Sequence, residues 1–198
     1  MIALWDLGNV VVRWEPEEIL QKLNYTAEQT DYVRSELLGH PDWLALDRGT
    51  TTEAVVAERL VDESGLSMDQ ALRCFDVVRE SLTDLPQSIE LLHQMKRAGI
   101  SQYVLSNMSA VNADYLRRRD YFGLFDGVMI SAEEKLIKPE VDIFKTVLER
   151  FQLDPAETFF IDDSKPNIDV AQSLGINALH FHRSDACYQS VRDAFKLS

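Results

Sequence analysis

The chain has 198 residues, of which 45% are hydrophobic and 27% charged, as in a globular protein with one substantial core. Its 20 Lys and Arg against 33 Asp and Glu give a formal net charge of −13, which argues against a nucleic acid or an anionic membrane as the main partner. We see no basic stretch before an apolar region at the start, as a signal peptide would have, and no apolar run with the length of a membrane span. The two cysteines, Cys74 and Cys187, lack metal-binding spacing and fit a reducing compartment. We therefore expect a cytoplasmic protein.

The first predicted element is a short buried strand that ends at a carboxylate. Residues 2–5 form an apolar run, Asp6 follows it directly, and Gly8 marks a turn. Parallel α/β sheets keep their chemistry at the carboxyl ends of the strands, so Asp6 is a candidate catalytic residue. An aspartate in this place also commonly caps a helix or a turn, which leaves a structural role open.

Residues 14–82 show helical periodicity and no strand pattern. Proline and acidic residues at 15–18 are typical of a helix start. Capping sequences at residues 26–29, 51–53 and 67–70 indicate further helix starts. We therefore predict a small bundle of about four helices, inserted after the first strand.

From residue 86 onward, predicted helices and strands alternate. Helices are expected over residues 86–97, 113–119, 140–151 and 167–174, and strands over residues 103–105, 128–130, 158–161 and 178–181. Such alternation predicts an α/β fold with a parallel, Rossmann-like sheet covered on both faces. The sequence thus predicts a core domain of residues 1–13 and 83–198 and a helical domain of residues 14–82.

Polar residues follow three of the predicted strands, and a lysine lies in a loop before a helix. These residues are Asp6, Ser106, Asn107, Lys138, Asp162 and Asp163. Because the carboxyl ends of parallel strands meet at one edge of a sheet, we expect the side chains to lie close together. Taken singly, each also has a structural interpretation: a serine N-cap, a solvated lysine, or a pair of carboxylates that caps the next helix.

Three neighbouring carboxylates cannot all stay ionised without positive charge nearby. The natural compensation is Mg²⁺, which binds one or two carboxylates, waters and a substrate phosphate. Lys138 adds one positive charge, and the Ser106 hydroxyl and backbone N–H groups are donors for phosphate oxygens. The pattern predicts a phosphoryl-transfer site in which Asp6 attacks phosphorus and forms an aspartyl-phosphate.

These segments resemble the four motifs of the haloacid dehalogenase (HAD) superfamily, in order and over nearly the whole chain. The motifs are Asp6-Leu7-Gly8-Asn9-Val10, Leu105-Ser106-Asn107, Lys138-Pro139, and Phe160-Ile161-Asp162-Asp163 with Asn167. The helical insert resembles the superfamily's small α-helical cap, which closes over the site and selects the substrate. The resemblance implies the HAD fold, a Rossmann-like core with an inserted helical bundle.

The resemblance also implies roles for the motif residues. Asp6 would be the nucleophile, and Lys138 would assist catalysis. The implied Mg²⁺ ligands are Asp6, the carbonyl of Gly8, Asp162 and Asp163. The residues implied to hold the transferring phosphoryl group are Ser106, Asn107 and Lys138.

Gly8 departs from the superfamily's phosphatases, which usually carry a second aspartate two residues after the nucleophile. That aspartate protonates the leaving oxygen and later activates water, and such help is worth ~10²–10⁴ in rate. Its loss affects poor leaving groups most, so we expect a sugar phosphate whose phosphate is anomeric, because a hemiacetal hydroxyl is more acidic. The Asp-x-Gly-Asn-Val form and Asp47-Arg48-Gly49 also resemble a bacterial branch that includes α-glucose-1-phosphate phosphatases.

The predicted helical segment offers candidates for the missing acid–base group and for substrate binding. The acid–base candidates are Glu15, His40 and Asp47, and the simpler interpretation of each is an exposed polar residue. Arg48 is a predicted substrate contact, because its planar guanidinium suits oxyanions. Trp14 and Trp43 either line the entrance or belong to the core of the bundle.

The leading hypothesis is a Mg²⁺-dependent phosphatase that acts on a small phosphorylated metabolite. One alternative is a 2-haloacid dehalogenase, in which the same aspartate attacks carbon. That chemistry needs no metal, so the acidic pair at 162–163 speaks against it. A second alternative is a weakly active relative that binds a phosphorylated ligand or a partner protein, supported only by Gly8. The metabolite and the oligomeric state are left open.

Overall fold

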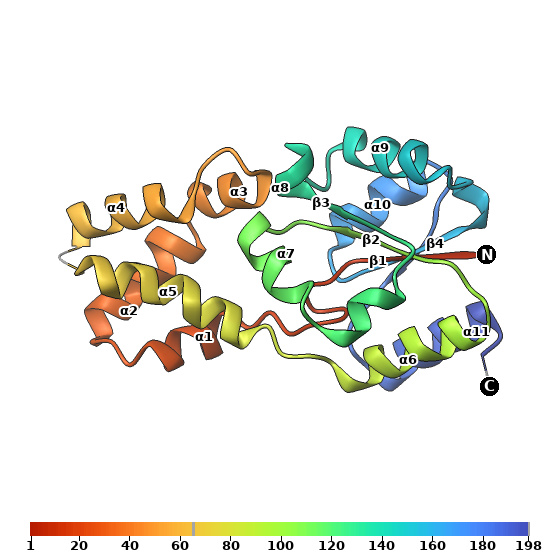
Figure 1. Cartoon of the computed structure of the whole chain (residues 1–198), viewed down its shortest axis with the longest axis horizontal. Helices are drawn as coiled ribbons and strands as arrows, with labels where there is room; N and C mark the ends of the chain where they lie inside the picture. The colour runs from red at the N-terminus through yellow and green to blue at the C-terminus, as the bar shows by residue number, and fades with distance from the viewer. Residues whose placement is uncertain (65, 198) are drawn as a thin grey trace.

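A computed structural model describes residues 1–64 and 66–197 of the chain (Figure 1). Five strands form one parallel sheet in the order β3-β2-β1-β4-β5. The strands are β1 (Ile2–Trp5), β2 (Gln102–Ser106), β3 (Gly127–Ile130), β4 (Thr158–Asp162) and β5 (Asn177–His180). All their carboxyl ends therefore lie at one edge, with β1 at the centre. The predicted parallel α/β architecture is confirmed.

Helices cover both faces of the sheet (Figure 1). Helices α6 (Pro86–Arg97) and α11 (Asp185–Phe195) lie on one face, and α9 (Val141–Phe151) and α10 (Lys165–Ser173) on the other. Successive side chains of a strand point to opposite faces. Trp5 accordingly joins the buried cluster that includes α6 and α11, whereas Leu4 joins the cluster that includes α9 and α10. Burial on both faces explains why the strands read as near-continuous apolar runs.

A helical lobe lies beside the carboxyl edge of the sheet, away from both termini (Figure 1). Its elements are α1 (Pro16–Leu23), α2 (Ala27–Val33), the π-helical segment η1 (Arg34–Leu38), α3 (Pro41–Arg48), α4 (Glu53–Ser64) and α5 (Met68–Ser81). The lobe has its own buried cluster, which includes Ile19, Leu37 and Leu60. The boundaries of a core of residues 1–13 and 83–198 and a helical domain of residues 14–82 stay a prediction.

The expected count of about four helices in this lobe is too low, since the described part of residues 14–82 holds five α-helices and η1. Helix α3 was not predicted because its N-cap is His40. The ring Nδ1 of His40 accepts a hydrogen bond from the backbone amide of Asp42, where a serine or aspartate is the usual cap.

In the part of the chain that the structure covers, no helix combines the length and apolarity needed to cross a bilayer. The cytoplasmic location stays a prediction.

Two of the longer helices of the core differ from the predicted elements, and the short helix α8 (Ser131–Glu134) was not predicted. Helix α7 (Ala110–Leu116) begins three residues before the expected start, because the Ser109 hydroxyl caps it by accepting from the Asn112 amide. Helix α11 was not predicted, although Ser184 caps it in the same way. The other short elements are η2 (Asp120–Leu124) and η3 (Pro155–Glu157). The other predicted boundaries from residue 86 onward agree within two residues.

Gly49 ends α3 where the lobe contacts the core. Its φ of +69° lies in the left-handed region, and a Cβ there would lie 2.3 Å from the Ala132 carbonyl oxygen. Lys135 also donates from Nζ to the Gly49 carbonyl. A side chain at this position therefore conflicts with both the local backbone and the contact between α3 and α8.

We expect Gly49→Ala to lower the free energy of unfolding by about 1–3 kcal/mol through the left-handed strain alone, and further through the clash with α8. Gly99→Ala is the matched control, because Gly99 has a φ of +72° but a Cβ added there would meet no atom within 4 Å. Urea unfolding of the two variants measures the difference. Equal losses would contradict a tight contact at Gly49.

Candidate active site

A cavity of about 350 Å³ lies between the carboxyl edge of the sheet and the helical lobe. The residues that line it from the sheet side include Gly8 and the polar residues Asp6, Asn9, Asn107, Lys138 and Asp163. The lobe and its connections contribute Trp14, Trp43, Asp47 and Leu82. Ser106 and Asp162 lie beneath these residues and are almost completely buried. The sheet edge thus brings together all the motif carboxylates, Ser106 and Lys138 around one cavity.

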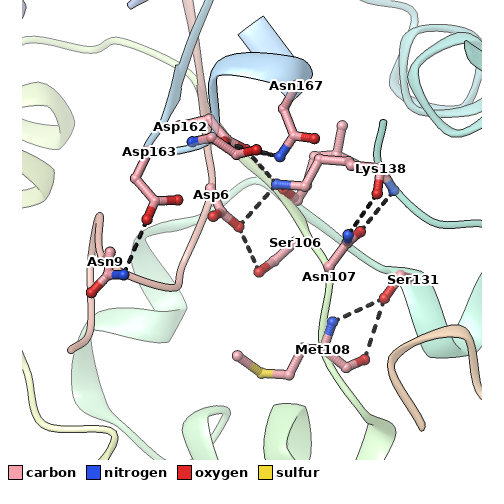
Figure 2. Close-up of polar contacts among 12 residues, drawn as sticks. Asp6, Asn9, Ser106, Asn107, Met108, Ser131, Lys138, Asp162, Asp163 and Asn167 are labelled. Carbon is pink, nitrogen blue, oxygen red and sulfur yellow. Dashed lines mark hydrogen bonds and ion pairs between the residues drawn. The ribbon is translucent and has the colours of Figure 1, made fainter. Parts of the chain in front are cut away.

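Asp6 follows β1, and its amide donates to the Ile161 carbonyl at 2.9 Å, which fixes the residue against β4. One carboxylate oxygen, Oδ1, accepts from the Ser106 hydroxyl at 2.7 Å and lies 3.0 Å from Lys138 Nζ (Figure 2). Burial raises the pKa of Asp6 to about 7, against the opposing effect of Lys138. Ser106 therefore does not cap a helix through its hydroxyl. It holds the carboxylate of Asp6.

Lys138 lies in the loop before α9 and is buried, not solvated. Its Nζ lies 2.6 Å from Asp162 Oδ2 and 3.0 Å from Asp6 Oδ1, and it donates to the Leu105 carbonyl at 2.9 Å. These three contacts match the three donors of an ammonium group. Burial alone would lower the pKa of Lys138, but the carboxylates of Asp162 and Asp6 outweigh it and raise the pKa. The lysine stays charged between two carboxylates.

Asn107 holds the loop that carries Lys138. Its Nδ2 donates to the Lys138 carbonyl at 2.9 Å, and its Oδ1 accepts from the Lys138 amide at 2.8 Å (Figure 2). The side-chain amide is therefore engaged with backbone, although Asn107 also lines the cavity. A direct contact between Asn107 and a phosphoryl group stays a prediction.

Asp162 and Asp163 end β4 beside Asp6. Asp162 accepts from Ser164 N at 2.7 Å and from Asn167 Nδ2 at 3.0 Å, in addition to its contact with Lys138. One oxygen each of Asp6, Asp162 and Asp163 lies within 4.8 Å of the other two. Three carboxylates outweigh the charge of one lysine, and burial raises the pKa of Asp163 above its ordinary value. An all-oxygen donor set of this kind fits a hard divalent cation such as Mg²⁺.

Asn9 is a site residue to which the motif pattern gave no separate role. It has a left-handed φ of 55° in the turn after β1. Its Nδ2 donates to Asp163 Oδ2 at 3.0 Å, and its Oδ1 accepts from the Trp14 amide at 3.1 Å (Figure 2). Asn9 therefore positions an acidic residue of the site and the start of the lobe together. An asparagine in a turn after an active-site strand is the sequence signal for such a role.

Of the lobe residues, Asp47 reaches the cavity and Arg48 does not line it. The Arg48 guanidinium forms two hydrogen bonds to the Glu140 carboxylate, at 2.6 and 3.0 Å, and so bridges the lobe and the core. Its predicted contact with substrate stays a prediction. Glu15 pairs with Arg183 at 2.7 Å, and neither Glu15 nor His40 lines the cavity.

Trp14 and Trp43 form part of the cavity wall and of the packing of the lobe at once. Their rings stack with centroids 5.1 Å apart and an interplanar angle of 30°. Both also pack against the buried cluster of the lobe. The two interpretations made from the sequence, an entrance lining and a core position, therefore both hold.

The structure thus combines a parallel sheet, a buried aspartate, a buried lysine and an acidic pair at the carboxyl edge, and a helical lobe beside that edge. The chain belongs to the haloacid dehalogenase-like hydrolase family, whose sequence model matches residues 3–175. The helical lobe corresponds in position to the cap inserted after the first strand.

Similar proteins include a sesquiterpene phosphatase, astK, from Aspergillus oryzae, which is 28% identical over 96% of this chain and 94% of its own length. The (S)-2-haloacid dehalogenase 4A from Burkholderia cepacia is 25% identical over 91% of this chain and 79% of its own. A crystal structure of the HAD family enzyme bt-2542 from Bacteroides thetaiotaomicron, in complex with magnesium and inorganic phosphate, superimposes with a TM-score of 0.77. It is 26% identical and covers 92% of this chain and 94% of its own.

Proposed function

We propose that this protein is a Mg²⁺-dependent phosphatase that hydrolyses a small phosphorylated metabolite through an aspartyl-phosphate on Asp6. The observation that carries the proposal is the contact of Lys138 with both Asp6 and Asp162, beside a third carboxylate at Asp163. This arrangement prepares one carboxylate to react and leaves an acidic set for a cation. The relatives named above, a phosphatase and an enzyme crystallised with magnesium and phosphate, give further support.

In this mechanism, Asp6, the carbonyl of Gly8, Asp162 and Asp163 would hold Mg²⁺, which would supply positive charge to the transferring phosphoryl group. Ser106 and Lys138 both contact Asp6 Oδ1 and so fix the orientation of the carboxylate that attacks phosphorus. Lys138 also offsets charge that develops on the phosphoryl oxygens. The helical cap excludes bulk water from the cavity while the ester bond breaks.

The acidic pair favours a phosphatase over the dehalogenase alternative. Attack on the carbon of a haloacid needs no metal, and the haloacid carries its own negative charge into the cavity. Asp163, which lines the cavity, would repel such a substrate unless a cation were bound. The alternative of a weakly active binding protein loses support because the nucleophile, the lysine and the acidic set are in contact.

For the substrate, we propose first a sugar phosphate with its phosphate at the anomeric carbon, because Gly8 provides no acid for a poor leaving group. A second candidate, the phosphate ester of an apolar alcohol, is favoured by the cavity wall. Trp14, Trp43, Leu82 and Met108 line it, and one of the similar proteins is a sesquiterpene phosphatase. Each wall residue presents apolar surface to the part of the substrate beyond the phosphate.

We expect phosphate release to require Mg²⁺ and to stop in EDTA, with recovery when Mg²⁺ is added in excess. Mg²⁺ binds the ionised carboxylate, and burial raises the pKa of Asp6 to about 7, so the affinity for Mg²⁺ should fall as the pH drops below 7. Phosphate release from glucose 1-phosphate, glucose 6-phosphate and a prenyl monophosphate is measured with Mg²⁺ and with EDTA, above and below pH 7. The same panel compares the two substrate candidates. Preferred turnover of glucose 6-phosphate would contradict both substrate candidates, and full activity in EDTA would contradict the metal site.

A further inference from the structure

We propose that Asp47, on the helical cap, is the general acid and base of the reaction. The inference rests on the proposed phosphatase function and adds to it a catalytic residue that the cap contributes. Among the described residues, three carboxylates line the cavity: Asp6, Asp47 and Asp163. Asp6 and Asp163 belong to the acidic set that fits a cation, and Asp47 lies outside that set. Asp47 is therefore the lining carboxylate that is left for proton transfer.

The position of Asp47 is held from the core through its backbone. Its carbonyl oxygen accepts from the Ser131 hydroxyl at 2.5 Å. Ser131 Oγ in turn accepts from the amide of Met108, at 2.9 Å, just beyond the end of β2 (Figure 2). A short chain of hydrogen bonds thus fixes this part of the cap relative to the strand end that carries Ser106.

Neighbouring contacts strengthen this attachment. Arg48 binds Glu140 through two hydrogen bonds, and the Gly49 carbonyl accepts from Lys135. Both contacts join the end of α3 to the core, and their partners Lys135 and Glu140 flank Lys138 in the sequence. Proton transfer requires a group held within hydrogen-bond reach of the reacting oxygen, and a docked helix end provides that precision better than a free loop.

The electrostatic surroundings suit a group that gives and takes a proton near neutral pH. Burial is the main cause that raises the pKa of Asp47 to about 7, and the nearby charge of Asp6 adds to it, whereas the Ser109 N–H opposes it. Among the residues that the structure describes, the other charged groups lining the cavity are Lys138 and Asp163, and Arg48, which follows Asp47 in the sequence and pairs with Glu140, lies at the end of α3. A carboxyl with a pKa near the working pH is suited to general acid–base catalysis.

The reaction proceeds in two balanced steps. In the first, an Asp6 oxygen forms a bond to phosphorus, the bond to the ester oxygen breaks, and protonated Asp47 gives its proton to that oxygen, so the alcohol leaves. In the second, ionised Asp47 takes a proton from water, the water oxygen bonds to phosphorus, and the bond to Asp6 breaks to release phosphate. Asp47 ends protonated and Asp6 ionised, as both began.

An acid at Asp47 also bears on substrate choice. If the cap supplies the proton, the lack of a carboxylate at Gly8 no longer restricts the enzyme to acidic leaving groups. The choice between an anomeric phosphate and the phosphate of an apolar alcohol then falls to the cavity wall, with Trp14 and Trp43 as its main surfaces.

Asp47→Asn tests the proposal directly. We expect it to lower kcat/KM for an alkyl phosphate by ~10²–10⁴. With 4-nitrophenyl phosphate, whose leaving group needs no proton, the first step should stay close to the wild-type rate. The variant should then show a burst of one nitrophenol per site followed by slow turnover, because the aspartyl-phosphate lacks its base. Asp42→Asn is the matched control, since Asp42 lies on the same helix and does not line the cavity.

Gly8→Asp in the Asp47→Asn background provides a second test. A Cβ at Gly8 meets no atom within 4 Å and Gly8 lines the cavity, so a carboxylate fits there. We expect the double variant to be at least about ten-fold more active than Asp47→Asn alone, which is within the range of general acid–base catalysis. A purely structural role of Asp47 predicts no such recovery. If the wild type is active and Asp47→Asn either keeps full activity or loses activity without a burst, the role of Asp47 is contradicted and the proposed phosphatase function stands. No phosphate release from the wild type overturns the proposed function and the role of Asp47 together.

Discussion

Asp6→Asn is expected to reduce phosphate release by about 10⁴-fold or more, because an amide cannot form the aspartyl-phosphate and removal of a nucleophile costs on the order of 10⁶ in well-studied hydrolases. The substitution is nearly isosteric, and the amide oxygen can still accept from the Ser106 hydroxyl that now binds the carboxylate at 2.7 Å. The fold should therefore survive. Initial rates with the best substrate of the panel, in saturating Mg²⁺, measure the loss.

Asp42→Asn again serves as the control for a general effect of removing an acidic side chain, since Asp42 pairs with Arg59 in the cap and does not line the cavity. Thermal unfolding of both variants checks that they are folded. Retention of more than a tenth of the wild-type rate by Asp6→Asn would mean that water attacks phosphorus without the help of this carboxylate.

Lys138→Met is expected to lower the free energy of unfolding by about 3–5 kcal/mol at pH 8, because it leaves Asp6 and Asp162 buried without their cation. Urea unfolding measures this loss. Activity should fall as well, by at least about 10²-fold, since the charge opposite the phosphoryl group is removed. Lys165→Met is the control, because Lys165 is exposed and its pair with Asp169 lies on the surface, where such pairs contribute about 0–1 kcal/mol.

The stability loss in Lys138→Met should depend on pH in a defined direction. Burial already raises the pKa of Asp6 above its value in the unfolded chain, so the folded state binds more protons between about pH 4 and 7. Removing the lysine raises that pKa further. The loss should therefore shrink as the pH falls from 8 to 5, where the carboxyl becomes neutral. A loss that stays below about 1 kcal/mol at pH 8 would contradict the buried charge network.

The fold and much of the site could be predicted because their signals are local. Each buried strand reads as an apolar run, and Asp6, Ser106 and Asp162 stand at strand ends that a parallel sheet must bring together. The alternation of strands with helices, which implies a parallel sheet, was enough to place the acidic residues on one edge. The family membership agrees with the motif resemblance.

The parts that could not be predicted depend on contacts between distant residues. Arg48 pairs with Glu140, 92 positions away, so its guanidinium bridges the helical lobe and the core domain at the surface and does not line the cavity. Asn107 uses its amide to hold Lys138, 31 positions away. Asp47 is one of three acid–base candidates from the sequence, and only the contact of its backbone with Ser131 distinguishes it as a residue held against the core. No periodicity or motif carries this information.

The measurement that tests the central claim most directly is the stereochemical course at phosphorus. A phosphorothioate ester made chiral with two oxygen isotopes is hydrolysed by the wild-type enzyme in water enriched in the third isotope, and the configuration of the chiral thiophosphate product is determined. Attack by Asp6 followed by attack of water gives two in-line displacements, each with inversion, so the account predicts net retention. Net inversion would mean a single displacement by water, and Asp6 would then not be the nucleophile.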